Sequence, residues 1–293
     1  MDYQNGLHRG ADAVQDAASL GDILQRAKGL TSEQVERALD YQKQHGVRFG
    51  EAAVALGLAR ADDVVWALAQ QFHYPYAPAS DAADLNEELV VACSPFMEEV
   101  EAFRDLRSQL LLGVLGDSTD RRALAITSSD SGDGKTFVAA NLAVAFSQMP
   151  GRTLLIDANL RQPRLHTLFG VGATTGLSGI LAGRAEPNVI QPVAHLSNLY
   201  LMPAGVVAPN PVELLQRASF SLLLRELLAK FDHVLVDTPS HAMGSDARII
   251  SVHCGAALMV GRKGASRMNS MRTFVKLLNK SNVKMAGVLM NEH

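Results

Sequence analysis

The chain has 293 residues, of which 47% are hydrophobic and 19% are charged, and its formal net charge is −3. This composition is typical of a soluble globular protein with one large or two ordinary domains. The small acidic excess gives no support to nucleic-acid binding, and two cysteines far apart in sequence suggest neither a disulfide framework nor a metal site. The sequence has no apolar run of the roughly 18–20 residues that a spanning helix needs, and no signal-peptide pattern. These features predict a cytoplasmic protein.

Residues 1–75 contain an internal repeat with an offset of 28 or 29 residues. LGD at 20–22 recurs as FGE at 49–51, and each copy predicts a short amphipathic helix, a Gly-Leu turn and a second helix. The second helix of the first copy opens with TSEQ at 31–34, which has the spacing of a capping box. Two such units predict a small all-α module of four main helices.

This repeat resembles the N-terminal domain of type II secretion and type IV pilus assembly ATPases, whose arms carry an R-L-G-x-x-L signature. The resemblance implies either a structural or docking role or the binding of cyclic di-GMP. Arg48 preserves the arginine of the signature in the second copy, whereas Ser19 occupies that position in the first. Both roles stay open at this point.

Residues 76–97 are the expected linker, because Pro78 and Pro95 interrupt any long helix there. A helix is then predicted over residues 98–112. Glu101, Arg104 and Arg107 follow one another at spacings of three, which places them on one face of that helix.

Residues 123–141 carry the strongest functional signal. An apolar, strand-like run enters a Ser/Gly-rich turn that ends in GDGKT at 132–136 and opens into an Ala-rich helix. In such a strand–turn–helix, backbone N–H groups and the helix N-terminus surround the phosphates of a nucleoside triphosphate. Lys135 would neutralise the phosphate charge, and the Thr136 hydroxyl would ligate Mg²⁺. Ser129 departs from the common G-x4-G-K-[ST] pattern, which has glycine at that position.

From residue 123 onward, short apolar strands alternate with segments of helical periodicity. This alternation predicts that residues 98–293 form an α/β domain with a mainly parallel sheet covered by helices. The chemistry is then expected at the carboxyl ends of the strands. The expected strands are 123–128, 153–157, 199–202, 233–237, 256–260 and 285–290.

Two acidic residues meet that expectation. Asp157 ends one predicted strand and Asp237 ends another. A carboxylate at a strand end beside a phosphate-binding loop can hold Mg²⁺ directly or through water, as phosphoryl transfer requires. The alternative for either residue alone is a turn former or a helix cap.

The catalytic half resembles the bacterial tyrosine kinases of exopolysaccharide and capsule export, a branch of the deviant-Walker, MinD/ParA-like P-loop NTPases. The resemblance covers roughly residues 98–291. With its N-terminal module, the chain is most similar to the chain-length-determinant tyrosine kinases of the EpsG type, in which the kinase and the membrane-spanning regulator are separate polypeptides. The matching motifs are EAFRDLR (101–107), TSSDSGDGKT (127–136), LLIDANLRQPRLHTLFG (154–170), GLSGILAG (176–183), LYLMPAG (199–205), PNPVELL (209–215) and FDHVLVDTP (231–239).

This resemblance implies ATP and Mg²⁺ as cofactors, a homo-oligomer, and attachment to the inner membrane through a chain-length regulator. It also implies roles for individual residues. The residues expected to bind ATP are Ser131, Gly132, Asp133, Gly134, Lys135, Thr136 and Asn291, and those expected to bind Mg²⁺ are Thr136, Asp157 and Asp237. The residues expected to take part in catalysis are Lys135, Asp157 and Arg161. The residues expected at the oligomer interface are Glu101, Arg104 and Arg107.

The sequence departs from the family pattern at three points. Ser131 replaces a proline of the phosphate loop, and Asn159 replaces the second aspartate of a D-x-D motif. The family's C-terminal tyrosine cluster is missing, so Tyr74 and Tyr76 or another protein would have to accept phosphate. Two functions therefore stay open, namely a tyrosine kinase that controls polysaccharide chain length and a nucleotide-gated assembly switch that only hydrolyses ATP.

One further feature is independent of the resemblance. From residue 262 to residue 285 the chain has seven basic residues and no acidic residue. Arg272, Lys276 and Lys280 recur every four residues, which places them along one stripe of a helix. This pattern suggests an acidic partner tail or the anionic inner leaflet, against the alternative of an ordinary solvated face.

Overall fold

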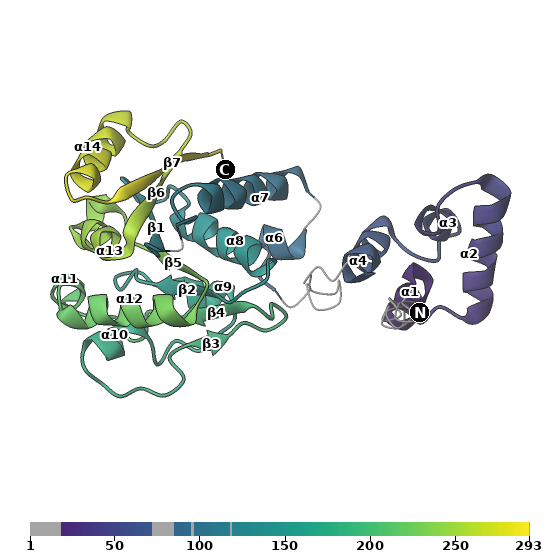
Figure 1. Cartoon of the computed structure of the whole chain (residues 1–293), viewed down its shortest axis with the longest axis horizontal. Helices are drawn as coiled ribbons and strands as arrows, with labels where there is room; N and C mark the ends of the chain where they lie inside the picture. Colours follow the sequence, from purple (N-terminus) through teal and green to yellow (C-terminus); the bar gives the residue numbers. More distant parts are fainter. Residues whose placement is uncertain (1–18, 72–84, 95–96, 118, 293) are drawn as a thin grey trace, which may run out of the picture. The chain divides into compact units, whose positions relative to one another are not determined.

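The computed structural model describes residues 19–71, 85–94, 97–117 and 119–292. It divides the chain into two compact units, residues 1–79 and residues 80–293 (Figure 1). Within the described ranges, no helix combines the length and the apolar character that crossing a membrane requires.

The described part of the first unit is entirely helical, as predicted from the repeat. Thr31 forms the predicted capping box, since its hydroxyl accepts from the Gln34 N–H and its own N–H donates to Gln34 Oε1. Helix α1 packs against α4, and α2 packs against α3, around a core that includes Leu24 and Ala67. The helices are α1 (Leu20–Lys28), α2 (Ser32–His45), α3 (Phe49–Ala55) and α4 (Ala61–Gln71).

The two signature positions of the repeat differ in this unit. The Ser19 hydroxyl accepts from the Asp22 N–H at the start of α1, so this residue acts as a helix cap. Arg48 precedes α3 and its side chain is exposed. Binding of cyclic di-GMP by this unit stays a prediction.

The second unit contains a seven-stranded sheet in the order β3-β4-β2-β5-β1-β6-β7. All neighbouring pairs are parallel except β3 with β4, so the expected mainly parallel sheet is confirmed. Strand β3 is two residues long and antiparallel, too short to give a periodic signal in the sequence. The strands are β1 (Ala123–Ser128), β2 (Thr153–Asp157), β3 (Gln191–Pro192), β4 (Leu199–Met202), β5 (His233–Asp237), β6 (Gly255–Arg262) and β7 (Lys284–Asn291).

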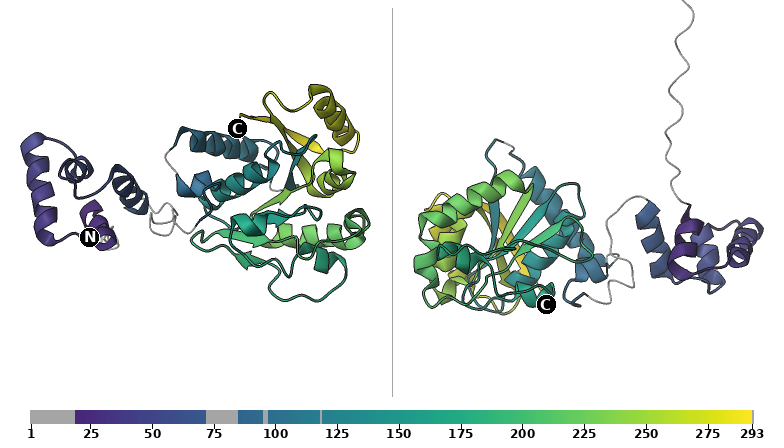
Figure 2. Two further views of the ribbon diagram at one scale, coloured as in Figure 1. Left: turned by 180° about the vertical axis from the view of Figure 1, so that it is seen from behind. Right: turned by 90° about the horizontal axis from the view of Figure 1, so that it is seen from below.

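Helices cover both faces of this sheet (Figures 1 and 2). Every residue of β1 is buried, and its side chains alternate between two cores, with Leu124 and Ile126 in one and Ala123 and Ala125 in the other. The first core is closed by α6 (Val90–Cys93), α7 (Glu98–Leu112), α8 (Lys135–Ser147) and α9 (Leu165–Leu168). The second is closed by α10 (Leu177–Leu181), α11 (Pro211–Leu215), α12 (Ala218–Lys230), α13 (Asp246–Cys254) and α14 (Met268–Asn279).

The second half of the expected linker belongs to this unit. Helix α6 lies within residues 76–97, and its Val91 and Ala92 are buried. The Val91 N–H donates to Asn141 Oδ1 of α8, whose amide group in turn donates to the Glu88 carbonyl. The linker prediction was wrong for this segment. Prolines mark the limits of the segment in the sequence, but the apolar residues between them pack into the core.

Candidate nucleotide-binding and catalytic site

The phosphate loop joins the end of β1 to the start of α8, as the sequence predicts. Gly132 and Gly134 have φ angles of +83° and +89°, a region that favours glycine. A Cβ atom on Gly134 would also collide with the Asn291 amide group, so a larger residue there would displace that side chain. The Ser131 hydroxyl lies 3.2 Å from the Ser240 hydroxyl, which connects the loop to the segment after β5.

Thr136, Asp157 and Asp237 come together at the carboxyl ends of β1, β2 and β5. Asp157 and Asp237 are paired residues of adjacent parallel strands, and both are almost completely buried. The Thr136 hydroxyl donates to Asp237 Oδ2 over 2.7 Å. Asp157 accepts three backbone hydrogen bonds of 3.1 Å, which fix its orientation; the donors are Asn159, Arg164 and Leu165.

Burial shifts the titration of all three central charged groups. It raises the pKa of Asp157 to about 7, and the neighbouring Asp237 charge adds to that increase. Burial also raises the pKa of Asp237 to about 6, against the hydrogen bond from Thr136 and the charge of Lys135. Burial lowers the pKa of Lys135, against the charges of Asp237 and Asp133. Two carboxylates and one ammonium group thus share a site with little water.

This donor set fits Mg²⁺. Among the described residues, the buried Asp237 Oδ1 atom has no hydrogen-bond partner, although buried carboxylate oxygens normally have one. Carboxylate and hydroxyl oxygens are ligands that Mg²⁺ prefers. A divalent cation would supply the missing partner of Asp237 and lower the repulsion between the two carboxylates.

We expect Asp157 to make the metal-free protein lose stability as the pH rises from about 4 to about 7, relative to an Asp157→Asn variant. The folded-state pKa of Asp157 is about 7 instead of 3.8, so the folded state binds more protons than the unfolded state within this window. The free energy of unfolding therefore decreases with pH, by an amount of more than about 1 kcal/mol. Urea unfolding at several pH values, with and without Mg²⁺-ADP, checks this. Burial lowers the pKa of His233, His241 and His253, which adds a slope of the opposite sign in both proteins. Equal slopes for the wild type and Asp157→Asn without ligand would therefore contradict the assignment.

A cavity of about 340 Å³ opens beside these groups. Arg164 lines it, but Arg161 does not. The Arg161 guanidinium instead forms two 3.1 Å hydrogen bonds with the carboxylate of Asp246, the buried first residue of α13. A catalytic role for Arg161 stays a prediction, and Arg164 is the arginine at the cavity. The lining consists of Ser131, Gly132, Lys135, Thr136, Asn159, Gln162, Pro163, Arg164, Ser240 and Met243.

A set of contacts that sequence reasoning missed holds the phosphate loop to the turn after β6 and to the end of β7. The buried Asp133 carboxylate accepts from the Asp130 N–H and, over 2.6 Å, from the Ser266 hydroxyl. Ser266 lies in the turn between β6 and α14, where its hydroxyl also accepts from the Arg262 N–H. The Asn291 amide donates to the Asp133 carbonyl over 3.3 Å. Asp133 therefore positions the loop through contacts with residues more than a hundred positions later.

Replacement of Ser266 by alanine is expected to raise the KM for ATP by about 3–10-fold. The change removes a hydrogen bond to a buried carboxylate, and such a bond contributes about 1.5–3 kcal/mol. Part of this free energy keeps the loop in the conformation that binds phosphate. Steady-state kinetics checks this, with Ser270→Ala on α14 as the matched control. Ser266→Thr keeps the hydroxyl and should restore the KM; equal KM values for Ser266→Ala and the wild type would refute the positioning role.

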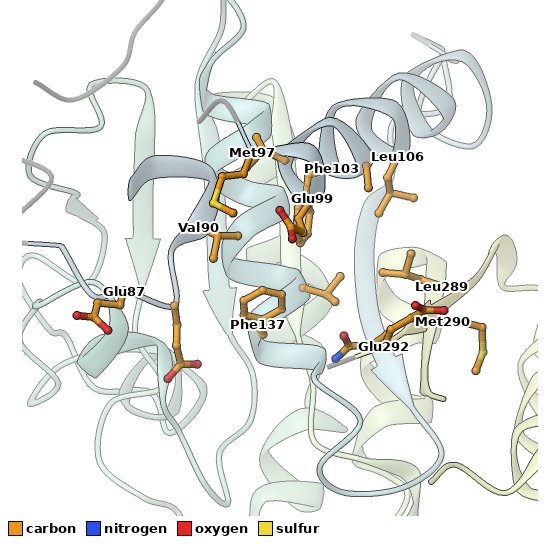
Figure 3. Close-up of a pocket in the computed structure, with 15 residues that line it drawn as sticks. Glu87, Val90, Met97, Glu99, Phe103, Leu106, Phe137, Leu289, Met290 and Glu292 are labelled. Carbon is orange, nitrogen blue, oxygen red and sulfur yellow. The ribbon is translucent and has the colours of Figure 1, made fainter. Parts of the chain in front are cut away.

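A second cavity, of about 670 Å³, lies beside the first turn of α8 (Figure 3). Its lining residues come from α6 and the residues before it, α7, α8 and the end of β7, and they are mostly apolar, with glutamates at several positions. Phe137 and Asn291 are among them, so this cavity adjoins both the phosphate loop and the residue that contacts Asp133.

The three residues assigned to a subunit interface do not share one environment. Glu101 is exposed and forms an ion pair with Arg104 on the same face of α7. The Arg107 guanidinium instead donates to the Ala145 carbonyl in the last turn of α8. Glu101 is exposed and both arginines are half-buried, so a role of all three residues at a subunit interface stays a prediction.

Comparisons with known proteins also point to a nucleotide-binding domain. Residues 124–293 match the CobQ/CobB/MinD/ParA nucleotide-binding domain family. The chain is 36% identical over 206 residues to the tyrosine-protein kinase Wzc of Salmonella typhi, covering 70% of this chain and 28% of that protein. It is 32% identical over 174 residues to the tyrosine-protein kinase CpsD of Streptococcus agalactiae, covering 59% of this chain and 76% of that protein.

Solved structures show the same similarity. The kinase domain of the Escherichia coli tyrosine kinase ETK aligns with a TM-score of 0.65 and 34% identity, covering 69% of this chain and 79% of that one. The chimerical protein CapA2B2 aligns with a TM-score of 0.65 and 28% identity, covering 71% of this chain and 92% of that one. The phosphate loop, the paired carboxylates and these similarities lead to one assignment: the chain belongs to the bacterial tyrosine kinases within the CobQ/CobB/MinD/ParA nucleotide-binding family.

Proposed function

We propose that this protein is an ATP- and Mg²⁺-dependent protein-tyrosine kinase. The observation that supports this most directly is the buried Asp157 carboxyl, whose pKa is raised to about 7 beside Asp237 and the phosphate loop. A pKa near the working pH suits a group that accepts a proton during a reaction. The pKa is raised although Asp157 accepts three backbone hydrogen bonds that act to lower it, because burial and the Asp237 charge outweigh them.

Each central residue has one task in this proposal. The loop N–H groups and Lys135 would bind the β- and γ-phosphates of ATP. Thr136 and Asp237 would hold Mg²⁺, which neutralises charge that develops on the transferred phosphoryl group. Asp157 would accept the proton of a tyrosine hydroxyl. In the same step the tyrosine oxygen would bond to the γ-phosphorus, and the bond from that phosphorus to the leaving ADP oxygen would break. Arg164 at the cavity would orient the acceptor or the γ-phosphate.

The base of ATP would occupy the near end of the larger cavity. Phe137 and Asn291 line that cavity beside the first turn of α8, where a nucleotide bound to the loop continues. The Phe137 ring offers an apolar contact, and the Asn291 amide can both donate and accept hydrogen bonds. Because Asn291 also contacts the Asp133 carbonyl, base binding and loop position would be coupled.

The proposed setting is the export of exopolysaccharide, next to a separate membrane-spanning chain-length regulator. The protein would act as a homo-oligomer, with Glu101, Arg104 and Arg107 of α7 at the subunit interface. Regulator binding would hold it at the inner membrane. The resemblance in sequence supports these points.

A second candidate is a nucleotide-gated switch that hydrolyses ATP without phosphorylating tyrosine. Two observations favour it. The described tyrosines do not line the small cavity; Tyr200, for example, packs against Phe231. Asn159, in place of a second aspartate, donates to the Gln162 carbonyl and so stabilises its loop without adding negative charge. Tyr74 and Tyr76 lie outside the described residues.

Transfer of labelled γ-phosphate separates the two candidates. The purified chain would be incubated with Mg²⁺-ATP, with and without the cytoplasmic segment of the regulator, and the label would be assigned to amino-acid type and position. Label on tyrosine supports the kinase. A Tyr74→Phe/Tyr76→Phe double variant then shows whether these two tyrosines accept the phosphate. Free phosphate with no labelled protein in either condition would leave only the switch.

A further inference from the structure

The C-terminal part of the catalytic unit has an unbalanced charge. Between Asp246 and Glu292 the chain has no acidic residue and eight basic ones, although the whole chain has a net charge of −3. The structure describes this entire segment. The basic residues are Arg248, Arg262, Lys263, Arg267, Arg272, Lys276, Lys280 and Lys284.

Helix α14 and its C-cap residue, Lys280, present three of these charges to solvent. Its opposite side is buried in the second core through Met271, Phe274 and Leu278. Arg272, Lys276 and Lys280, which we call the basic stripe, are exposed and lie four residues apart. Within the described ranges, none of the three forms an ion pair or a side-chain hydrogen bond. Like charges at this spacing repel one another slightly, so the arrangement does not stabilise the helix.

Neighbouring elements add further positive charges, and Asp117 is an acidic residue near one of them, since the Lys284 charge, after hydrogen bonds from Thr119, helps to lower its pKa. Arg248 of α13 reaches the end of α14, where its guanidinium donates to the Ser281 hydroxyl, and Lys284 at the start of β7 is exposed. The flanking acids are already engaged. Asp246 is buried and pairs with Arg161, and Glu292 pairs with Lys263. Among the described residues, the basic stripe thus has no neutralising neighbour.

We propose that the basic stripe binds an anionic lipid surface. Its three charges are exposed along one side of α14 and its C-cap, and none of them lines either of the two cavities described above. A bound acidic peptide would need pockets or an apolar anchor for specificity, whereas a bilayer needs only a broad exposed field of basic side chains.

The apolar side of α14 is committed to the core, so the helix cannot insert into the lipid. Binding would therefore be electrostatic, reversible and strongly salt-dependent. It would hold this face of the catalytic unit against the membrane without the regulator. The inference does not depend on whether the site transfers phosphate to tyrosine or only hydrolyses ATP.

Flotation of the full-length chain with lipid vesicles tests the proposal. The wild type should bind vesicles that contain phosphatidylglycerol, should bind phosphatidylcholine vesicles much more weakly, and should be released by salt. A Lys276→Glu/Lys280→Glu variant should bind the anionic vesicles about 30-fold more weakly or worse, since each basic side chain near such a surface contributes about fivefold.

The matched control is Arg225→Glu/Lys230→Glu, which changes the net charge equally on exposed positions of α12. It should keep most of the binding, and nucleotide binding should be unchanged in both variants as evidence of folding. Equal binding by the wild type and the α14 variant would overturn the proposal, as would equal losses in both variants. Binding to soluble polyglutamate but not to anionic vesicles would assign the basic stripe to an acidic polypeptide instead.

Discussion

Replacement of Lys135 by alanine is expected to lower the rate of γ-phosphate transfer or hydrolysis by about 10²–10³-fold. Lys135 is 8% exposed and is the cation placed at the phosphate loop next to Asp237. Removal of one preorganised, charge-assisted contact to the reacting phosphate in a site with little water costs about 3–4 kcal/mol of transition-state stabilisation. Single-turnover assays with labelled ATP measure the effect.

The matched control is Lys230→Ala, because Lys230 is an exposed lysine at the end of α12. This variant should keep the wild-type rate. Lys135→Ala should remain folded, since Thr136 still donates to Asp237 and the apolar cores are untouched. Comparable activity of the two alanine variants would show that the loop is not the catalytic phosphate site.

Asp237→Asn should have opposite effects on activity and on stability. We expect turnover to fall by at least about 10²-fold, because a neutral amide holds Mg²⁺ far less well than a carboxylate does. In the absence of ligand, however, the variant should be more stable than the wild type at pH 7–8, by about 1–2 kcal/mol. Its amide oxygen can still accept from Thr136, and the buried charge that raises the pKa of Asp157 is removed.

Urea unfolding of the ligand-free proteins and a titration of turnover with Mg²⁺ measure these two effects. Asp105→Asn on α7 is a matched control, since the Asp105 carboxylate is exposed and its loss should change neither quantity. A destabilised and fully active Asp237→Asn protein would mean that Asp237 only supports the fold. The expected combination means that the protein retains a costly buried charge because the reaction needs it.

The local features of the site could be predicted from sequence. Gly132 and Gly134 shape the backbone of one short loop, and Lys135 and Thr136 open the helix that follows it, so their spacing in the chain sets their relative positions. Four of the expected strands have the predicted bounds, and β6 and β7 extend the other two by one or two residues at their ends. Buried parallel strands are short apolar runs, which is a strong signal even without partners.

The sequence by itself thus determined the strand–loop–helix, the alternation of strands and helices, and the two strand-end carboxylates, because each depends on residues close together in the chain. Only the tertiary structure decided which distant side chains meet. It placed Arg161 on Asp246 and brought Arg164 to the cavity. It also joined Asp133 to Ser266, and it buried part of the expected linker. Those contacts join residues up to 133 positions apart, and no local pattern specifies them because the packing of whole strands and helices sets their distances.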